Sequence, residues 1–253
     1  MPGPIKYVGG KSRLAKIIIE RIPAHVTYVE PFCGGAKVFF QKQRSKVEIL
    51  NDLDSQLVNF YRVCQSHHEE LIRSISMMPV SRELFSDFRA NKQSGLTDIQ
   101  RAARFLYLQK LCYAGQVTGK GFFVPLDTKH DLHYDLISKA LSEAHSRLAG
   151  VQIEHLPYSE IIRRYDRPAT FFYLDPPYYD FHFYNHNFEH DDFVQLAKTV
   201  KSIKGKFLLS LNDHAEVRKL FASFTIKIVK LAYSLNRAGG ESSQELLISN
   251  FAQ

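Results

Sequence analysis

Short apolar segments recur along the chain and predict seven strands. These segments are rich in aromatic and β-branched residues and are bounded by glycine, proline or polar residues, as expected for strands buried in a sheet. The predicted strands lie within residues 27–36, 47–54, 151–156, 169–174, 206–211, 224–231 and 245–250. The connector before the last strand, around residues 236–240, leaves no room for a helix, so the final two strands should pair antiparallel.

Helical periodicity fills most of the intervals between these strands. Residues 55–150 are poor in strands, and their apolar positions from Leu57 to Ile75 repeat at helical spacing. Asp54 is a candidate N-cap for a helix that begins near Ser55. Further helices are expected over residues 12–22, 37–43, 134–148 and 191–202. The order of elements predicts an α/β protein with a mixed sheet and a long helical segment between the second and third strands.

Composition narrows the class of protein further. The chain has 253 residues, of which 45% are hydrophobic, so it can form one large domain or a core with a subdomain. Its net charge of +7 favours a polyanionic partner, although many basic proteins bind no nucleic acid. We see neither a bilayer-spanning run nor a signal peptide, and therefore expect a cytoplasmic protein. The three cysteines lack metal-ligand spacing, so we expect no metal, and nothing requires more than a monomer.

The tetrapeptide Asp175-Pro176-Pro177-Tyr178 directly follows the strand predicted within residues 169–174. Proline has no N–H for a sheet ladder, so the motif marks the carboxyl end of that strand, where open α/β sheets bind ligands. The amino group of a nucleic-acid base is a weak nucleophile because its lone pair is delocalised into the ring. A carboxylate from Asp175 and the carbonyl of Pro176 can hold both of its N–H groups, and the Tyr178 ring can stack on an extruded base. The alternative is an ordinary strand end with a tight turn.

Two glycine-containing segments near the start of the chain predict a ligand site. In residues 6–11 a pair of glycines precedes Lys11, which suits close approach to an anionic group, whereas a flexible basic N-terminus is the alternative. Residues 30–35 form a turn between a strand and a helix whose N-terminus faces the ligand. This turn lacks the dinucleotide-binding glycine pattern, and Glu30 suits a cationic group such as an α-amine.

Asp52 stands at the end of the second predicted strand, next to Leu53. In nucleotide-binding sheets an acidic residue at this point holds the hydroxyls of a ribose. We therefore interpret Asp52 as a ribose ligand and Asp54 as the helix cap.

Several segments have the residues of a nucleic-acid surface. Residues 113–123 combine glycines with hydrogen-bonding side chains and suit a loop that enters a DNA groove, although an ordinary surface loop is equally compatible. Residues 180–190 are rich in aromatic residues and histidine, and we interpret them as a cover with stacking side chains. The candidate DNA-binding residues are Arg104, Lys110, Tyr113, Gln116, Thr118, Lys120, Tyr184 and Arg237.

Taken in order, these motifs resemble the Dam-like, D12-class DNA adenine-N6 methyltransferases over nearly the whole chain. The Asp-Pro-Pro-Tyr sequence alone is shared with other amino methyltransferases, but the ordered set is much more specific. The matching segments are Tyr7 to Lys11, Glu30 to Gly35, Asp52, Asp175 to Tyr178, Asn212 to His214 and Glu245 to Ile248.

The resemblance implies a Rossmann-like seven-stranded sheet, S-adenosylmethionine as cofactor and double-stranded DNA as substrate. It implies a catalytic domain of residues 1–60 and 150–253 and a helical target-recognition insert of residues 61–149. The expected catalytic residues are Asp175, Pro176, Pro177 and Tyr178. The expected cofactor-binding residues are Tyr7, Gly9, Gly10, Lys11, Glu30, Pro31, Phe32, Gly34, Asp52, Leu53 and Asp175.

The chain departs from the family members that read GATC. Those members carry Asn after the tyrosine that corresponds to Tyr113 and an Arg in the loop beyond it. Here Ala114 takes the place of Asn, and no Arg occurs between Tyr113 and Pro125. The resemblance therefore implies N6-adenine chemistry without implying the GATC site.

Two other functions fit parts of the sequence. An enzyme with the same cofactor could methylate cytosine N4 or an RNA base, although Asp at position 175 favours adenine by the family pattern. A non-catalytic DNA-binding protein on a methyltransferase scaffold would be the alternative of another class. The presence of both Asp52 and Asp175 argues against it, because a protein without catalysis does not require the pair.

Overall fold

The computed structural model describes residues 3–5, 12–90, 95–112, 121–122, 133–180, 187–231 and 243–252. In this part of the chain, seven strands form one sheet in the order β3-β2-β1-β4-β5-β7-β6. Neighbours from β3 to β5 are parallel, whereas β7 is antiparallel to both β5 and β6. The strands are β1 Thr27–Glu30, β2 Val47–Asn51, β3 Gln152–Glu154, β4 Thr170–Leu174, β5 Lys206–Asn212, β6 Thr225–Leu231 and β7 Ser243–Ser249. The predicted mixed sheet and its antiparallel final pair are confirmed.

The helices expected from the sequence are present, with small differences at their ends, and two short helices that were not expected follow β3 and β5. The helices are α1 Ser12–Ile19, α2 Lys37–Gln41, α3 Ser55–Ser66, α4 His68–Ser76, α5 Arg82–Ala90, α6 Asp98–Leu111, α7 Tyr134–Leu148, α8 Tyr158–Tyr165, α9 His190–Lys201 and α10 Ala215–Leu220. Asp54 caps α3 as expected, because its carboxylate accepts hydrogen bonds from the backbone N–H groups of Gln56 and Leu57 at 2.9 and 3.4 Å. Over the described ranges, no helix has the length and apolar character needed to cross a membrane.

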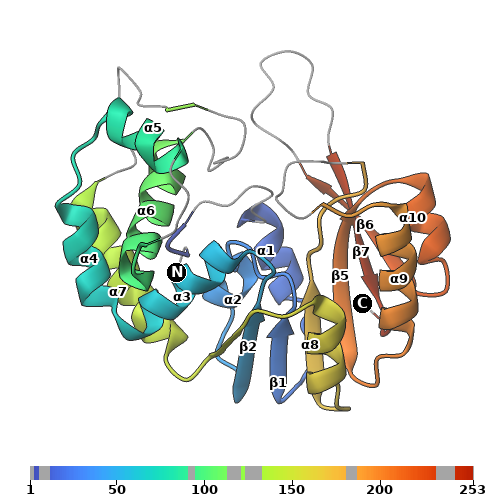
Figure 1. The fold of residues 1–253 in the computed structure, drawn as a ribbon. Helices are drawn as coiled ribbons and strands as arrows, with labels where there is room; N and C mark the ends of the chain where they lie inside the picture. The colour runs from blue at the N-terminus through green and yellow to red at the C-terminus, as the bar shows by residue number, and fades with distance from the viewer. Residues whose placement is uncertain are drawn as a thin grey trace.

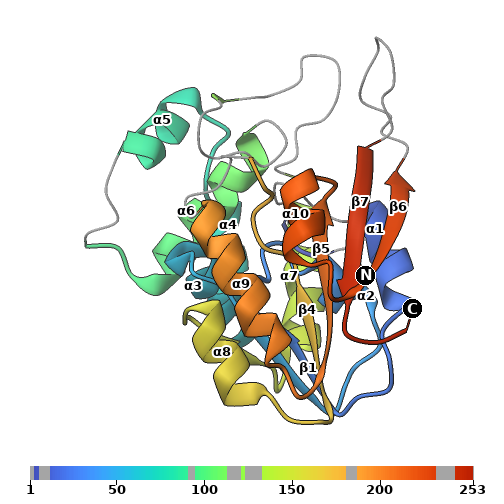
Figure 2. The same ribbon diagram turned by 90° about the vertical axis from the view of Figure 1, so that its right-hand side faces the viewer.

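Helices cover both faces of the sheet (Figure 1). Every residue of β4 is buried, and successive side chains alternate between the faces. Phe171 and Tyr173 join the core that includes residues of α1, α2, α3 and α7. Phe172 and Leu174 join the core that includes residues of α8, α9 and α10. Figure 2 views the molecule from the side on which α9 and α10 lie.

Five helices, α3 to α7, connect β2 to β3 and lie together at one side of the sheet, on the left of Figure 1. The expected insert boundary at residue 61 falls inside α3, where Tyr61 and Cys64 share a buried core with Tyr28 of β1. Helix α7 is also part of that core, through Ile137 and other residues. The division of the chain into a catalytic domain and a recognition insert remains a prediction.

The strand order brings the loops after β1, β2 and β4 together at the carboxyl ends of these strands. β1 lies between β2 and β4, and all three are parallel, so their carboxyl ends meet. The chain passes to β2 on one side of β1 and returns on the other side as β4, which makes this edge the switch point at which α/β sheets bind ligands.

Candidate active site

The loop after β2 directs Asp52 toward the glycine turn after β1. One carboxylate oxygen of Asp52 accepts a hydrogen bond from the Gly34 N–H at 2.9 Å, and the other accepts from the Asp54 N–H at 3.0 Å. Gly34 has a φ of 46°, in the left-handed region that glycine adopts without strain. Burial raises the pKa of the Asp52 carboxyl, and the backbone N–H groups oppose that rise. Two predicted cofactor-binding segments are thus joined by direct hydrogen bonds.

Asn51, the last residue of β2, ties together the ends of three strands. Its side-chain N–H groups donate to the carbonyl of Pro31 at 2.8 Å and to the carbonyl of Leu156 at 2.9 Å. Its side-chain oxygen accepts from the Leu156 N–H at 2.9 Å. Asn51 is 1% exposed, so these bonds satisfy a buried amide and fix the loops after β1 and β3 beside Asp52. Nothing in the sequence around Asn51 indicates this role.

Glu30 lies inside the protein beneath the glycine turn, with 1% of its surface exposed. One oxygen accepts from the Tyr28 hydroxyl at 2.6 Å and from the Phe39 N–H at 2.9 Å. Ala36, at the N-cap of α2, makes no side-chain cap bond, so Glu30 supplies an acceptor to the first turn of that helix. Burial raises the pKa of Glu30 to about 8. Its observed contacts are structural, and a contact with a ligand amine remains a prediction.

A group of aromatic side chains lies at the same edge of the sheet. The Phe32 ring is 5.2 Å from the Tyr158 ring and 5.7 Å from the Phe188 ring, measured between centroids. Phe32 is partly exposed, and Leu53, next to Asp52, is 37% exposed. Both predicted contacts therefore offer apolar surface to a ligand. The buried Pro31 instead presents its carbonyl to Asn51.

The loop after β4 presents Asp175, which is oriented from the neighbouring strand β5. The Ser210 hydroxyl is completely buried and donates to a carboxylate oxygen of Asp175 at 2.9 Å. The Tyr173 hydroxyl lies 3.0 Å from the same Ser210 oxygen and extends the hydrogen-bonded chain into the core. Pro176 is buried, so the motif leaves the strand in a fixed direction.

Asn212, at the end of β5, holds the rest of this loop. Its side-chain oxygen accepts from the Tyr179 N–H at 2.9 Å, and its side-chain nitrogen donates to the Tyr179 carbonyl at 3.1 Å. The Tyr179 ring stacks on His214, with centroids 4.4 Å apart and an interplanar angle of 23°. The segment after β5 therefore fixes the backbone beside Tyr178, whose hydroxyl in turn contacts Glu245 of β7.

Comparison with known proteins shows the family to which this chain belongs. A family model described as D12 class N6 adenine-specific DNA methyltransferase matches residues 7–235. The chain belongs to this family. It is 29% identical to the Type II methyltransferase M.MjaIII of Methanocaldococcus jannaschii, over 98% of each chain. It is 26% identical to a DNA adenine methylase of Vibrio cholerae, over 96% of this chain and 94% of the relative.

A solved structure with some similarity is a putative class I S-adenosylmethionine-dependent methyltransferase from Listeria monocytogenes. Its TM-score is 0.42 at 11% identity, with 95% of this chain and 60% of that chain covered. Among the alternatives left by the sequence, the family match supports the adenine-specific enzyme. The chain is an adenine-specific DNA methyltransferase by family.

Few of the DNA contacts expected for this methyltransferase fall on described residues. Arg104 is 9% exposed and donates to the Phe88 carbonyl at 2.7 Å, so in this conformation it joins α6 to α5. Lys110, in the last turn of α6, is partly exposed. Their DNA contacts remain predictions. The other predicted residues lie outside the described ranges: Tyr7, Gly9, Gly10, Lys11, Tyr113, Gln116, Thr118, Lys120, Tyr184 and Arg237.

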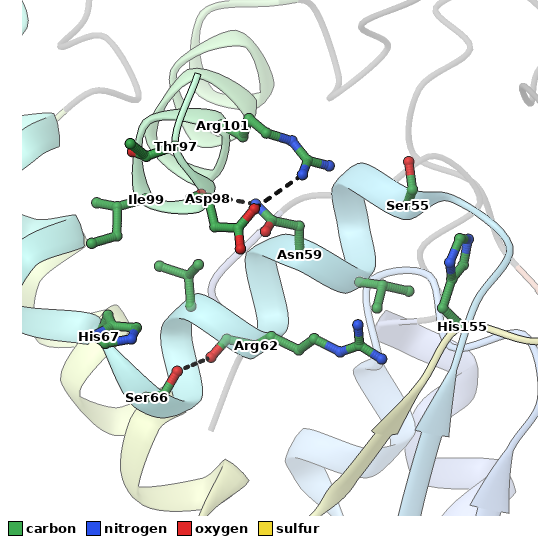
Figure 3. Close-up of a pocket in the computed structure, with 12 residues that line it drawn as sticks. Ser55, Asn59, Arg62, Ser66, His67, Thr97, Asp98, Ile99, Arg101 and His155 are labelled. Carbon is green, nitrogen blue, oxygen red and sulfur yellow. Dashed lines mark hydrogen bonds and ion pairs between the residues drawn. The ribbon is translucent and has the colours of Figure 1, made fainter. Parts of the chain in front are cut away.

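A hydrophilic pocket of about 550 Å³ lies against α3 and α6 (Figure 3). Two of its charged residues form an ion pair, Arg101 with Asp98 at 3.1 Å, and Arg62 donates to the Ile153 carbonyl at 3.0 Å. Asn59 donates to the Asp98 carbonyl at 2.9 Å. None of the predicted site residues lines this pocket. In the part of the chain that the structure describes, no group of three His, Cys, Asp or Glu side chains could hold a metal ion.

Proposed function

We propose that the enzyme moves a methyl group from S-adenosylmethionine to N6 of an adenine extruded from double-stranded DNA. The supporting observation is the placement of two oriented carboxylates, Asp52 and Asp175, after the strands on either side of β1. Gly34 fixes the first through its N–H, and Ser210 fixes the second through its hydroxyl. One carboxylate suits the hydroxyls of a ribose, and the other suits an amino group.

The residues around Asp52 fit such a cofactor. A carboxylate offers about four acceptor positions, and two backbone N–H groups and the Cys33 thiol donate to Asp52 here, so it can still accept from a ribose hydroxyl. The rings of Phe32, Tyr158 and Phe188 provide apolar surface of the kind that binds a purine. When bound, S-adenosylmethionine supplies a methyl group on a positively charged sulfur, open to in-line displacement.

In this proposal Asp175 and the carbonyl of Pro176 accept the two N–H groups of the target amine. Holding both of them favours a tetrahedral nitrogen with a localised lone pair. Because Ser210 orients the Asp175 carboxylate before the base arrives, little reorganisation is needed. Catalysis then depends mostly on positioning and electrostatics. The amino proton leaves afterwards through Asp175 or solvent.

Tyr178 provides the ring on which the extruded adenine stacks. Stacking of a base on an aromatic side chain contributes about 1–3 kcal/mol, which offsets part of the cost of unpairing the base. The helical segment between β2 and β3, with the loop of residues 113–123, reads the DNA. Because Ala114 stands where GATC-reading members have Asn, we expect a different recognition site.

Methylation of DNA that lacks N6-methyladenine tests the proposal directly. The purified enzyme is incubated with this DNA and S-adenosylmethionine, and the product is analysed by nucleoside mass spectrometry and modification-sensitive sequencing. We expect N6-methyladenine within one short motif, and none when the cofactor is omitted. N4-methylcytosine as the product, or no modified base despite cofactor binding, would contradict the proposal.

Asp52→Asn is expected to weaken binding of S-adenosylmethionine by about 10- to 100-fold, the range for loss of a hydrogen bond to a charged group. The amide retains one acceptor but turns its nitrogen toward one of the two backbone N–H donors. Isothermal titration calorimetry measures the affinity, and circular dichroism checks the fold. Asp54→Asn is the matched control, because Asn also caps helices and should leave cofactor affinity unchanged. Equal affinities for the two variants would remove Asp52 from the cofactor site.

A further inference from the structure

The hydroxyl of Tyr178 is held by a buried carboxylate far away in the sequence. It donates to both oxygens of Glu245, at 2.5 and 2.6 Å. Glu245 lies on β7 and is 3% exposed. In the register of the sheet it lies opposite Asn212 of β5 and Val229 of β6. The carboxylate is therefore buried in the protein interior, where it contacts Tyr178 of the Asp-Pro-Pro-Tyr motif.

We infer that Glu245 is a positioning residue for methyl transfer, which acts on the target adenine through the ring of Tyr178. The inference rests on the proposed stacking of adenine on Tyr178. Two effects of the same hydrogen bond support it, one geometric and one electrostatic.

The geometric effect is that the Tyr178 side chain is held at both ends. At the backbone, Asn212 bonds to the N–H and the carbonyl of the next residue, Tyr179. At the tip, Glu245 accepts from the phenol. Rotation of the side chain about its χ angles would break the bond at the tip. A ring fixed in this way presents its face to the base without a further loss of rotamer entropy.

The electrostatic effect concerns the charge that develops on the base. As N6 forms its bond to the methyl carbon, the carbon–sulfur bond breaks and its electron pair stays on sulfur. The base carries positive charge until the amino proton leaves to Asp175 or solvent. An aromatic face attracts positive charge, and a phenol that donates to a carboxylate has a more electron-rich ring. Glu245 thus strengthens a contact that matters most in the transition state.

The burial of Glu245 fits a functional role better than a packing role. On β7 it lies between the exposed Gln244 and the completely buried, apolar run of Leu246, Leu247 and Ile248. A charged side chain in this environment loses hydration, which is costly unless hydrogen bonds compensate for it. Both carboxylate oxygens accept from Tyr178, the last residue of the Asp-Pro-Pro-Tyr motif.

A double-mutant cycle tests the inference. Glu245→Gln keeps the size of the side chain and an acceptor for the phenol but removes the charge. We expect it to lower the single-turnover rate of adenine methylation about tenfold, within the range that a cation–π contact supplies. Affinities for S-adenosylmethionine and DNA should stay within about twofold, because the change affects the transition state. In the Tyr178→Phe background the same substitution should cause no further loss.

The results of these measurements distinguish a failure of the proposed role of Glu245 from a failure of the proposed stacking of adenine on Tyr178. An unchanged rate in Glu245→Gln, or an equal loss with and without the Tyr178 hydroxyl, would overturn the role of Glu245. A normal rate in Tyr178→Ala would instead overturn the stacking of adenine on Tyr178. If Glu245→Gln does not fold, Glu245→Asp serves in its place. Asp keeps the charge, but its side chain is one methylene shorter and places the carboxylate farther from the phenol. The methylation rate should fall by the same factor as expected for Glu245→Gln, and only when the Tyr178 hydroxyl is present.

Discussion

Asp175→Ala is expected to lower the rate of adenine methylation by about 10²–10³-fold, the usual effect of removing one preorganised transition-state contact. The substitution deletes the acceptor that Ser210 orients and leaves the target amine with the Pro176 carbonyl alone. The fold should persist, because Asp175 is partly exposed and its strand β4 is buried through other residues. Single-turnover measurements of N6-methyladenine give the rate, and far-UV circular dichroism checks the fold.

Asp191→Ala provides the matched control for this measurement. Asp191 is an exposed acid in the first turn of α9, and its loss should leave the methylation rate close to that of the unmodified enzyme. A folded Asp175→Ala protein with normal activity would rule out the proposed mechanism. A large loss of activity in Asp191→Ala would show that the assay responds to general damage.

The strands could be predicted from the sequence because each carries its signal locally. The run from Thr170 to Leu174 is apolar throughout, and Asp175-Pro176 marks its end without any knowledge of the rest of the chain. Helices α8 and α10 were not predicted from the sequence. Helix α8 buries Ile161 and Ile162 within eight residues and α10 buries Val217 within six, so each offers too few positions for a helical repeat to be recognised. Such short helices depend on packing against the sheet.

Some residues of the candidate site could likewise be predicted from the sequence, and others could not. Asp52 and Asp175 could be identified because each directly follows a recognisable strand. Their supports could not, since Ser210 is 35 residues from Asp175 and Glu245 is 67 residues from Tyr178. Nothing local in a buried Ser or Glu shows which side chain it will contact. Only the strand order, with β5 beside β4 and β7 beside β5, brings these groups together.

Glu30 illustrates the opposite limitation. Its position after a strand and before a glycine turn suggested a ligand for an amine, whereas its observed partners are Tyr28 and Phe39. A carboxylate at a strand end can serve either a ligand or the first turn of the following helix. The N-cap residue of α2 is Ala36, whose side chain cannot accept a hydrogen bond. An N-cap without an acceptor indicates that another residue must accept from the first turn of the helix.

Glu48→Gln is expected to destabilise the enzyme by about 3–5 kcal/mol, the usual cost of breaking a buried ion pair. Glu48 of β2 contacts Lys42 at 2.5 Å and Arg147 of α7 at 2.5 Å, and all three side chains are less than a tenth exposed. The Arg147 guanidinium also lies 3.7 Å from the centre of the Phe39 ring. Removing the negative charge would leave two buried cations without their shared anion. This cluster joins α2, β2 and α7, away from the carboxyl ends of the strands.

The pH dependence of stability gives this prediction a second readout. Burial alone would raise the pKa of Glu48, but hydrogen bonds from Arg147 and Lys42 outweigh it and hold the pKa below its usual value. A lowered folded-state pKa means that the unfolded chain binds the proton more readily. The contribution of Glu48 is therefore present above the unfolded-state pKa and is lost as pH falls through the folded-state pKa.

Urea unfolding of the unmodified enzyme and of Glu48→Gln, at neutral pH and in acid, measures both effects. The difference in free energy of unfolding should be large at neutral pH and should shrink in acid, where Glu48 is protonated in both states. Glu160→Gln is the control, since Glu160 pairs with Arg163 and Arg164 at 2.6 Å on the surface, where ion pairs contribute little. Equal stability of Glu48→Gln and the unmodified enzyme at neutral pH would show that hydrophobic contacts alone fasten α7 to the sheet. Because the cluster lies away from Asp52 and Asp175, the methylation rate of the folded Glu48→Gln variant should be normal.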